Sequence, residues 1–333
     1  MSLPLVVVGG SAGGLDAATR FVGALEPGLP AAVAVVLHQA VGAGSYVARR
    51  LQRATGLGVE MVEDGDELEP ARIYVAPADR HLRFDDDVAR VAFGPRVNRA
   101  RPAIDVALRS AAAEYGARAV GVILSGFLDD GAAGLAALHQ CGGRVLIQDP
   151  DDAQHNDMPR NALASVSPDA VGTPEELAEE LNALLSTLPA ERGTIPEVVQ
   201  IEARIDALAT GDIDMTNRIG EPVPLSCPDC AGPVWEICAP GPPRYRCHVG
   251  HAFSQKSMLR SQEETVEESL WVALRTLEER ARMLDRMSAS NRASIASSYR
   301  VQAEETRGHA DRIRDLLAAR HPVADPQPRG AAA

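Results

Sequence analysis

Three short segments of the sequence place a serine, a histidine and an aspartate where they could share one hydrolytic reaction. Ser11 stands in the glycine-rich run Gly9–Gly14, directly after an apolar stretch that begins at Leu5. The pattern Gly-x-Ser-x-Gly, satisfied from Gly9 to Gly13, is typical of a serine whose hydroxyl is exposed on a tight strand-to-helix turn. A structural glycine-rich turn with an incidental serine is the alternative interpretation of the same residues.

A dinucleotide-binding loop fits these glycines less well. That fingerprint reads Gly-x-Gly-x-x-Gly, and an acidic residue at the end of the second strand binds the ribose. Here Ser11 takes the place of the second glycine, and His38 ends the second apolar run. Both departures disfavour a nucleotide. They leave His38 as a candidate general base for Ser11, with a histidine that merely ends a strand as the alternative.

The aspartate follows a third apolar run, Ala119–Leu124, which leads into Ser-Gly-Phe-Leu-Asp-Asp-Gly. Asp129 or Asp130 could orient the imidazole of His38 and stabilise its charged form while the serine attacks. The alternative is that both aspartates cap the helix that follows, where acidic side chains are favourable. Serine, histidine and aspartate at three strand ends together favour nucleophilic catalysis.

The elements around these residues must bring them together. Near-continuous apolar runs alternate with helical patterns over residues 1–190, which predicts an α/β fold: a doubly wound, mostly parallel sheet with helices on both faces. Ligands of such sheets bind at the carboxyl ends of the strands, where all three candidates lie. The expected strands are Leu5–Val8, Ala32–Leu37, Arg72–Ala76, Ala119–Leu124 and Arg144–Gln148, with a further strand at 59–62 and a hairpin at 82–93.

Composition and charge limit the class of partner. The chain has 333 residues and a formal net charge of −13, which counts against binding to nucleic acid or to an anionic membrane. No apolar run approaches the roughly 18 residues of a transmembrane span, and the N-terminus lacks the basic region of a signal peptide. Five cysteines, an odd number without an export signal, indicate a reducing compartment and a cytoplasmic location.

A second chemical cluster lies near the C-terminal third of the chain. A Cys-x-x-Cys pair and a cysteine–histidine group, which sixteen residues separate, have the spacing of a tetrahedral zinc site. Four protein ligands leave no open position, so we expect a structural Zn²⁺ rather than a catalytic one. A metal-free loop with reduced cysteines is the alternative. The predicted ligands are Cys227, Cys230, Cys247 and His251, with His248 as the alternative fourth ligand.

These patterns predict five regions along the chain. They are a catalytic domain (1–190), a linker with one helix (191–225), a zinc-ribbon-like Cys/His module (226–255), a helical hairpin (256–321) and a disordered tail (322–333). A capping-box pattern, Ser261-Gln-Glu-Glu264, predicts that the long helices begin at Ser261.

Over residues 4–186 the sequence resembles the catalytic domain of the chemotaxis protein-glutamate methylesterases (CheB type). Its acid loop, Leu-Thr-Gly-Met-x-x-Asp-Gly in the family, aligns with Leu124–Gly131 and puts Asp130 in the acid position. The resemblance implies that Ser11 is the nucleophile, His38 the base and Asp130 the acid, with no cofactor for catalysis. Further matching segments are Ile73-Tyr-Val-Ala-Pro-Ala-Asp-Arg-His81, Arg101-Pro-Ala-Ile-Asp105 and Met158-Pro-Arg-Asn-Ala162.

The chain departs from the family pattern at the substrate groove more than at the triad. Phe127 replaces the methionine of the acid loop, which the family associates with the oxyanion hole, and Ala12 replaces a threonine. Backbone N–H groups near Ala12 or Phe127 are therefore our candidates for that hole. Family members often begin with a receiver domain. Because the first predicted strand starts at residue 5, we expect no attached receiver and no regulation by its phosphorylation.

The resemblance implies a serine hydrolase that removes glutamate methyl esters from chemoreceptors and releases methanol in chemosensory signal transduction. The expected partners are the cytoplasmic helices of methyl-accepting chemoreceptors, with other chemosensory proteins as further candidates. Neither nucleic acid nor insertion into a membrane is expected. Two other functions stay open: deamidation of receptor glutamines by the same triad, and a non-catalytic signalling adaptor.

Overall fold

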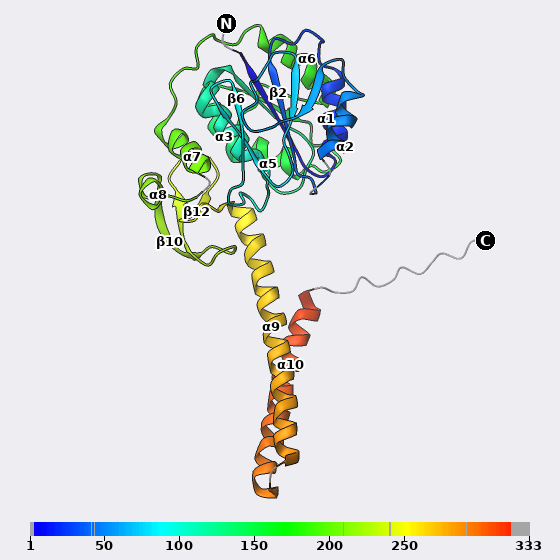
Figure 1. Ribbon diagram of the computed structural model, residues 1–333, viewed down its shortest axis with the longest axis vertical. Coiled ribbons are helices and arrows are strands. Elements are labelled where there is room, and N and C mark those ends of the chain that lie inside the picture. Colours follow the sequence, from blue (N-terminus) through cyan, green and yellow to red (C-terminus); the bar gives the residue numbers. More distant parts are fainter. Residues whose placement is uncertain are drawn as a thin grey trace, which may run out of the picture. The chain divides into compact units, whose positions relative to one another are not determined.

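The computed structural model describes residues 3–40, 42, 44–208, 210–239, 241–290 and 292–320. Its contacts divide the chain into two compact units, Met1–Leu259 and Arg260–Ala333. Figure 1 follows the elements in chain order from blue to red. The tail that the sequence predicts over 322–333 lies outside the described residues.

A seven-stranded, fully parallel sheet forms the centre of the first unit, in the order β3-β4-β2-β1-β7-β8-β9. The predicted parallel α/β sheet is therefore confirmed. The chain leaves β1 in one direction for β2 and later continues on the other side with β7, so the strand order reverses at β1, where ligands of such sheets bind. The strands are β1 (Leu5–Gly10), β2 (Ala32–Leu37), β3 (Gly58–Met61), β4 (Arg72–Val75), β7 (Ala119–Ile123), β8 (Arg144–Gln148) and β9 (Ala170–Gly172).

Helices cover both faces of this sheet, because successive strand residues point to opposite sides. In β1, Leu5 and Val7 belong to one hydrophobic cluster, and Val6 and Val8 belong to the other. Helices α3, α4 and α5 pack on the first face, and α1, α2 and α6 pack on the second (Figure 1). Their bounds are α1 (Gly14–Gly23), α2 (Gly44–Gln52), α3 (Ile104–Tyr115), α4 (Ala132–Gln140), α5 (Asp157–Ser165) and α6 (Pro174–Leu185).

A two-stranded hairpin, β5 (His81–Asp85) and β6 (Val88–Ala92), packs next to α3. The segment expected as a linker is more structured than its composition indicates. It contains α7 (Glu197–Leu208), α8 (Ile213–Ile219) and most of β10 (Gly220–Ser226). β10 begins a small antiparallel sheet in the order β10-β11-β12-β13, whose other strands are β11 (Pro233–Ile237), β12 (Arg244–Cys247) and β13 (Ala252–Ser254). We call residues 220–254 the Cys/His module.

Buried charges join the module to the parallel sheet's helices. Asp206 on α7 pairs with Arg109 of α3 at 2.9 Å and with Arg246 of β12 at 2.8 Å, and all three side chains are almost fully buried. Glu202, one turn earlier on α7, pairs with Arg244 of β12. Burial raises the pKa of Asp206, but the two arginine charges and hydrogen bonds outweigh it and lower the pKa to about 2. This contribution to stability is present above the ordinary aspartate pKa and is lost as the pH falls toward 2.

Replacing Asp206 with asparagine is expected to lower the free energy of unfolding by about 3–5 kcal/mol, because two buried guanidinium groups lose their shared counter-charge. Urea denaturation of the two proteins measures the difference. The matched control is Glu60→Gln, which removes one of the two acidic partners of the exposed Arg72 and should change stability by about 1 kcal/mol or less. Equal changes in the free energy of unfolding for the two variants would contradict a stabilising role of the buried ion pairs of Asp206.

The last two helices are long: α9 (Gln255–Ser290) and α10 (Ala293–Arg320). The residues of these helices from Arg260 on make up most of the described part of the second unit. Leu274 of α9 packs against Ala310 and Leu317 of α10. α9 begins six residues before the predicted start at Ser261, because Ser254 already serves as its cap: the Ser254 hydroxyl accepts a hydrogen bond from the N–H of Ser257 at 3.0 Å. None of the helices in the described part of the chain is long and apolar enough to span a membrane.

Candidate active site

The glycine-rich turn after β1 holds Ser11 at the carboxyl edge of the sheet. The Ser11 N–H donates to the carbonyl of Ser125 at 2.9 Å, and the Ser11 carbonyl accepts from the N–H of Gly14 at 2.8 Å. Gly13 has a φ of 71°, a left-handed conformation that favours glycine, and it forms the N-cap of α1. The backbone on both sides of Ser11 is thus fixed without using its hydroxyl.

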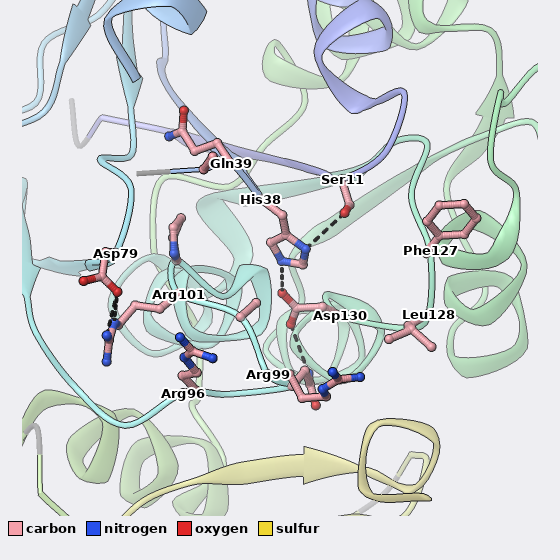
Figure 2. Close-up of a pocket in the computed structure, with 14 residues that line it drawn as sticks. Ser11, His38, Gln39, Asp79, Arg96, Arg99, Arg101, Phe127, Leu128 and Asp130 are labelled. Carbon is pink, nitrogen blue, oxygen red and sulfur yellow. Dashed lines mark hydrogen bonds and ion pairs between the residues drawn. The ribbon is translucent and has the colours of Figure 1, made fainter. Parts of the chain in front are cut away.

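His38 lies between the other two predicted residues and contacts both (Figure 2). Its Nδ1 lies 3.2 Å from the Ser11 Oγ, and its Nε2 lies 2.8 Å from the Asp130 Oδ2. A carboxylate can only accept, so the ring proton belongs on Nε2, and the lone pair on Nδ1 faces the serine. The two ring nitrogens are used in the opposite order to that of chymotrypsin-type proteases. The structure therefore brings Ser11, His38 and Asp130 into one hydrogen-bonded row.

Asp130 is buried and held by several donors. Its carboxylate accepts from the backbone N–H groups of Ile104 (2.7 Å) and Asp105 (3.2 Å), at the start of α3, and from the Asn98 amide (3.0 Å). Burial alone raises the pKa of Asp130, but the hydrogen bond and charge of His38, together with the Asn98 and Ile104 bonds, outweigh it and lower the pKa. Asp130 thus stays charged and can orient the imidazole.

Asp105, and not Asp129 or Asp130, is the acidic side chain that caps the start of α4. The Asp105 Oδ1 accepts from the N–H groups of Gly131 (3.0 Å) and Gly134 (2.6 Å) at the start of α4. Burial, followed by the charge of Asp130, raises the pKa of Asp105 to about 7. Asp129 instead accepts from the Ser254 hydroxyl at 2.8 Å. Neither Asp105 nor Asn98 is among the site residues predicted from the sequence, although the segment Arg101–Asp105 carries part of the family resemblance.

An open cavity of about 460 Å³ lies over the row of three residues (Figure 2). Its rim carries Arg96, Arg99 and Arg101, three positive side chains in a chain whose net charge is strongly negative. Arg101 donates to Asp79 at 2.6 Å, which lowers the pKa of that carboxyl, and its guanidinium lies 3.7 Å from the centre of the Phe93 ring. The cavity mouth favours an acidic surface as its partner.

Two backbone donors border the serine. Within the described part of the chain, the N–H groups of Ala12 and Phe127 make no backbone hydrogen bond. Phe127 is about half exposed on the cavity wall, and its ring packs against His155 with the ring centres 4.2 Å apart. Free N–H groups beside a nucleophile are the donors that a tetrahedral oxyanion needs.

The four predicted metal ligands also lie together. The His251 Nδ1 is 3.7 Å from the Cys227 Sγ and 3.6 Å from the Cys247 Sγ, and the Cys230 Sγ is 3.8 Å from the Cys247 Sγ. Zinc bonds of about 2.3 Å to sulfur and 2.1 Å to nitrogen place tetrahedral ligand atoms about 3.6–3.8 Å apart. The donors therefore fit a metal ion of this kind. His248 is not part of this group among the described residues.

The other ring nitrogen of His251 faces a carboxylate. Its Nε2 lies 3.8 Å from the Asp229 Oδ2, and Asp229 comes from the Cys-Pro-Asp-Cys turn itself. Metal-binding histidines commonly direct their second nitrogen at such a group, which fixes the ring orientation. This arrangement supports His251 as the fourth ligand.

A parallel α/β sheet with serine, histidine and aspartate at the ends of three strands is the arrangement of a serine hydrolase. The CheB methylesterase family model matches residues 6–181, which is more than half of the chain. The chain belongs to the CheB methylesterase family, as its sequence motifs predict.

Curated relatives and a solved structure agree with this assignment. A protein-glutamate methylesterase/protein-glutamine glutaminase of Yersinia pestis is 36% identical over 192 residues, which cover 56% of this chain and 55% of the relative. One from Anaeromyxobacter dehalogenans is 42% identical over 179 residues, covering 53% and 52%. The crystal structure of the Thermotoga maritima CheB methylesterase catalytic domain is 30% identical, with a TM-score of 0.53, and matches 55% of this chain and 100% of that one. The chain spans about half the length of the curated relatives it matches.

Proposed function

We propose that this protein is a protein-glutamate methylesterase that hydrolyses glutamate methyl esters on the cytoplasmic helices of chemoreceptors. The observation that carries the proposal is the hydrogen-bonded row Ser11–His38–Asp130 on the floor of an open cavity. Membership of the CheB methylesterase family supports the ester as substrate. The arginine-lined rim supports a carboxylate-rich protein surface around that ester. This substrate places the protein in the cytoplasm.

Hydrolysis would proceed through an acyl-enzyme. His38 accepts the proton of Ser11 on Nδ1 while the Ser11 Oγ attacks the ester carbonyl, and Asp130 stabilises the resulting imidazolium. The N–H groups of Ala12 and Phe127 would donate to the oxyanion. The imidazolium then protonates the departing methoxide, and methanol leaves. Water, deprotonated by the same imidazole, attacks the acyl group and releases glutamate and Ser11.

Deamidation of receptor glutamines is the second candidate activity, because the printed names of the relatives include glutaminase. The same residues would attack an amide, and ammonia would leave in place of methanol. A non-catalytic adaptor is disfavoured by the intact row of three residues. The leaving group therefore separates the two enzymatic functions.

Methanol and ammonia release from receptor-containing membranes tests the proposal. The wild-type chain is incubated with membranes whose chemoreceptors carry methyl-labelled glutamates, and in parallel with membranes whose receptors carry unmodified glutamines. We expect enzyme-dependent methanol release from the first. Ammonia release from the second, without methanol from the first, would favour the deamidase. Release of neither product would contradict both enzymatic functions.

We also propose that Cys227, Cys230, Cys247 and His251 hold a structural Zn²⁺. Thiolate and imidazole donors suit zinc, and the distances between the four ligand atoms support a tetrahedral site. When bound, the ion would join the turn after β10 to the turn after β12 and stabilise the small sheet. It would supply no chemistry to Ser11.

A further inference from the structure

The loop that carries Asn98 pairs with the free edge of the Cys/His module. The Asn98 N–H donates to the carbonyl of Ala252 at 2.8 Å, and Val97 forms a parallel bridge with the same residue. Ala252 begins β13, the last strand in the order of the small sheet. The loop therefore adds one more segment to the edge of that sheet. Because Asn98 and its neighbours also line the cavity, this wall of the cavity lies against the Cys/His module.

The Asn98 side chain connects this edge to the triad. Its amide nitrogen donates to the Asp130 Oδ1 at 3.0 Å and to the Asp105 Oδ2 at 2.7 Å. Its amide oxygen accepts from the N–H of Ser254 at 2.8 Å and from the hydroxyl of Ser257 at 3.1 Å. Both amide hydrogens and both oxygen lone pairs are thus used, half of them toward two carboxylates and half toward the module.

The chemistry of the neighbours fixes which way this amide points. Carboxylates cannot donate, so the NH₂ group must face Asp130, and a backbone N–H cannot accept, so the oxygen must face Ser254. The backbone of Asn98 has a φ of 49°, a left-handed conformation that asparagine tolerates better than most residues. Asn98 is also buried, and a buried polar network of this kind holds its members in one arrangement.

A second contact ties the module to the acid loop itself. The Ser254 hydroxyl donates to the Asp129 carboxylate at 2.8 Å, next to the triad residue Asp130. Ser254 therefore contacts the acid loop through its hydroxyl, and it contacts Asn98 through its backbone N–H. In addition, Ala252 directly follows the metal-ligand candidate His251, whose carbonyl accepts from the N–H of Cys247 at 2.9 Å.

We propose that Asn98 is a positioning residue of the esterase and that β13 of the Cys/His module holds it in place. The module then contributes to catalysis by fixing the orientation of Asp130 through Asn98. Ser254 is the second positioning residue, because its N–H sets the orientation of the Asn98 amide. The inference rests on the proposed function for its reaction. Both residues act through Asp130 on the imidazole of His38.

Asn98→Ala is the direct test, with phosphonylation of Ser11 by a fluorophosphonate, which releases fluoride, as the readout. We expect phosphonylation to be about 10- to 100-fold slower, since a small misplacement of catalytic groups has effects of this size. With methylated receptor, kcat should fall while KM changes little. Loss of the Asn98 N–H leaves Asp130 more basic and the imidazolium better stabilised, so the acidic limb of the rate profile should move to higher pH.

Two further variants separate the faces of the amide. Asn98→Asp keeps an acceptor for Ser254 and removes the donor to Asp130, so it should be at least as slow as Asn98→Ala. Ser254→Pro removes the donated N–H, and Ser254→Ala removes only the hydroxyl, so their difference isolates the bond to Asn98. That difference should vanish in an Asn98→Ala background if the module acts through Asn98. Ser226→Ala, at an exposed position of β10, is the control and should be phosphonylated as fast as the wild type.

The hydrogen-bonded proton between His38 and Asp130 gives a readout that needs no substrate. Its low-field NMR signal should exchange faster with water in Asn98→Ala than in the wild type. A folded Asn98→Ala protein with the phosphonylation rate, pH profile and NMR signal of the wild type would overturn the positioning role, and additive effects of Ser254→Pro and Asn98→Ala would overturn the route through Asn98. A wild-type protein that is phosphonylated by the reagent but releases no methanol from receptors would contradict the proposed function alone.

Discussion

Replacing Ser11 with alanine is expected to reduce methanol release by about 10⁴- to 10⁶-fold and to leave the protein folded. Loss of the nucleophile from a serine–histidine–aspartate enzyme has an effect of this size, and binding and oxyanion stabilisation account for the remaining activity. The fold should be unaffected because the Ser11 backbone is held by Ser125 and Gly14, whereas its hydroxyl contacts His38.

Initial rates on labelled receptor membranes measure the loss, and thermal unfolding confirms that the variant is folded. Ser45→Ala, an exposed serine on α2, is the matched control and should retain full activity. In the wild type, a serine-directed fluorophosphonate should label Ser11, and the label should be absent from Ser11→Ala. Undiminished methanol release by the Ser11 variant would show that another group performs the hydrolysis.

Sequence patterns predict the strand ends of this fold well because the central strands are buried on both faces. A run such as Ala32–Leu37 is apolar at every position. It ends where a polar residue that could take part in catalysis, here His38, begins the following loop. β9, three residues long, and α5 do not produce such a run and were not expected. The fold could therefore be predicted where burial is complete, and not at the short, half-exposed elements.

The charged residues of α7 show a different limit of sequence reasoning. Glu202 and Asp206 are one turn apart, which in a sequence is typical of a solvated helix face. They are buried because Arg109, Arg244 and Arg246 converge on them from α3 and β12. Ion pairs between segments almost 100 residues apart leave no periodic pattern in the sequence. The segment that contains α7 is therefore predicted as part of a linker, although Glu202 and Asp206 are buried in the first unit.

The same limit applies to the active site. Ser11, His38 and Asp130 could be proposed from the sequence because each lies in the turn or loop that follows a predicted strand. Asn98 and Ser254 could not, since they meet across 156 residues and neither belongs to a catalytic pattern. The choice between Asp129 and Asp130 also depended on the family resemblance; in the structure Asp130 contacts His38, and Asp129 contacts Ser254.

Removal of the metal is expected to unfold the Cys/His module. The metal would join two turns of a small sheet whose own hydrophobic cluster is limited to a few side chains around Val234 and Phe253. Structural zinc in small domains contributes an apparent binding free energy of about 10–16 kcal/mol at neutral pH, far more than such a cluster. Strong chelators, or Cys247→Ser, should therefore release one zinc ion per chain and disorder β11 to β13.

Trp235 reports this change directly, because it lies buried in β11 and its indole N–H donates to the Asn217 side chain at 2.8 Å. In a Trp271→Phe background, which removes the other tryptophan of the chain, chelation should shift the fluorescence of Trp235 to longer wavelength. Cys238→Ser, at an exposed cysteine outside the cluster, should keep both the zinc and the fluorescence of the parent protein. Less than half an equivalent of zinc in the purified wild type, or a Trp235 spectrum that chelation leaves unchanged, would contradict a structural metal. Loss of Ser11 phosphonylation by the fluorophosphonate, in step with the Trp235 shift, is expected as well, since β13 holds Asn98 and Asn98 holds Asp130.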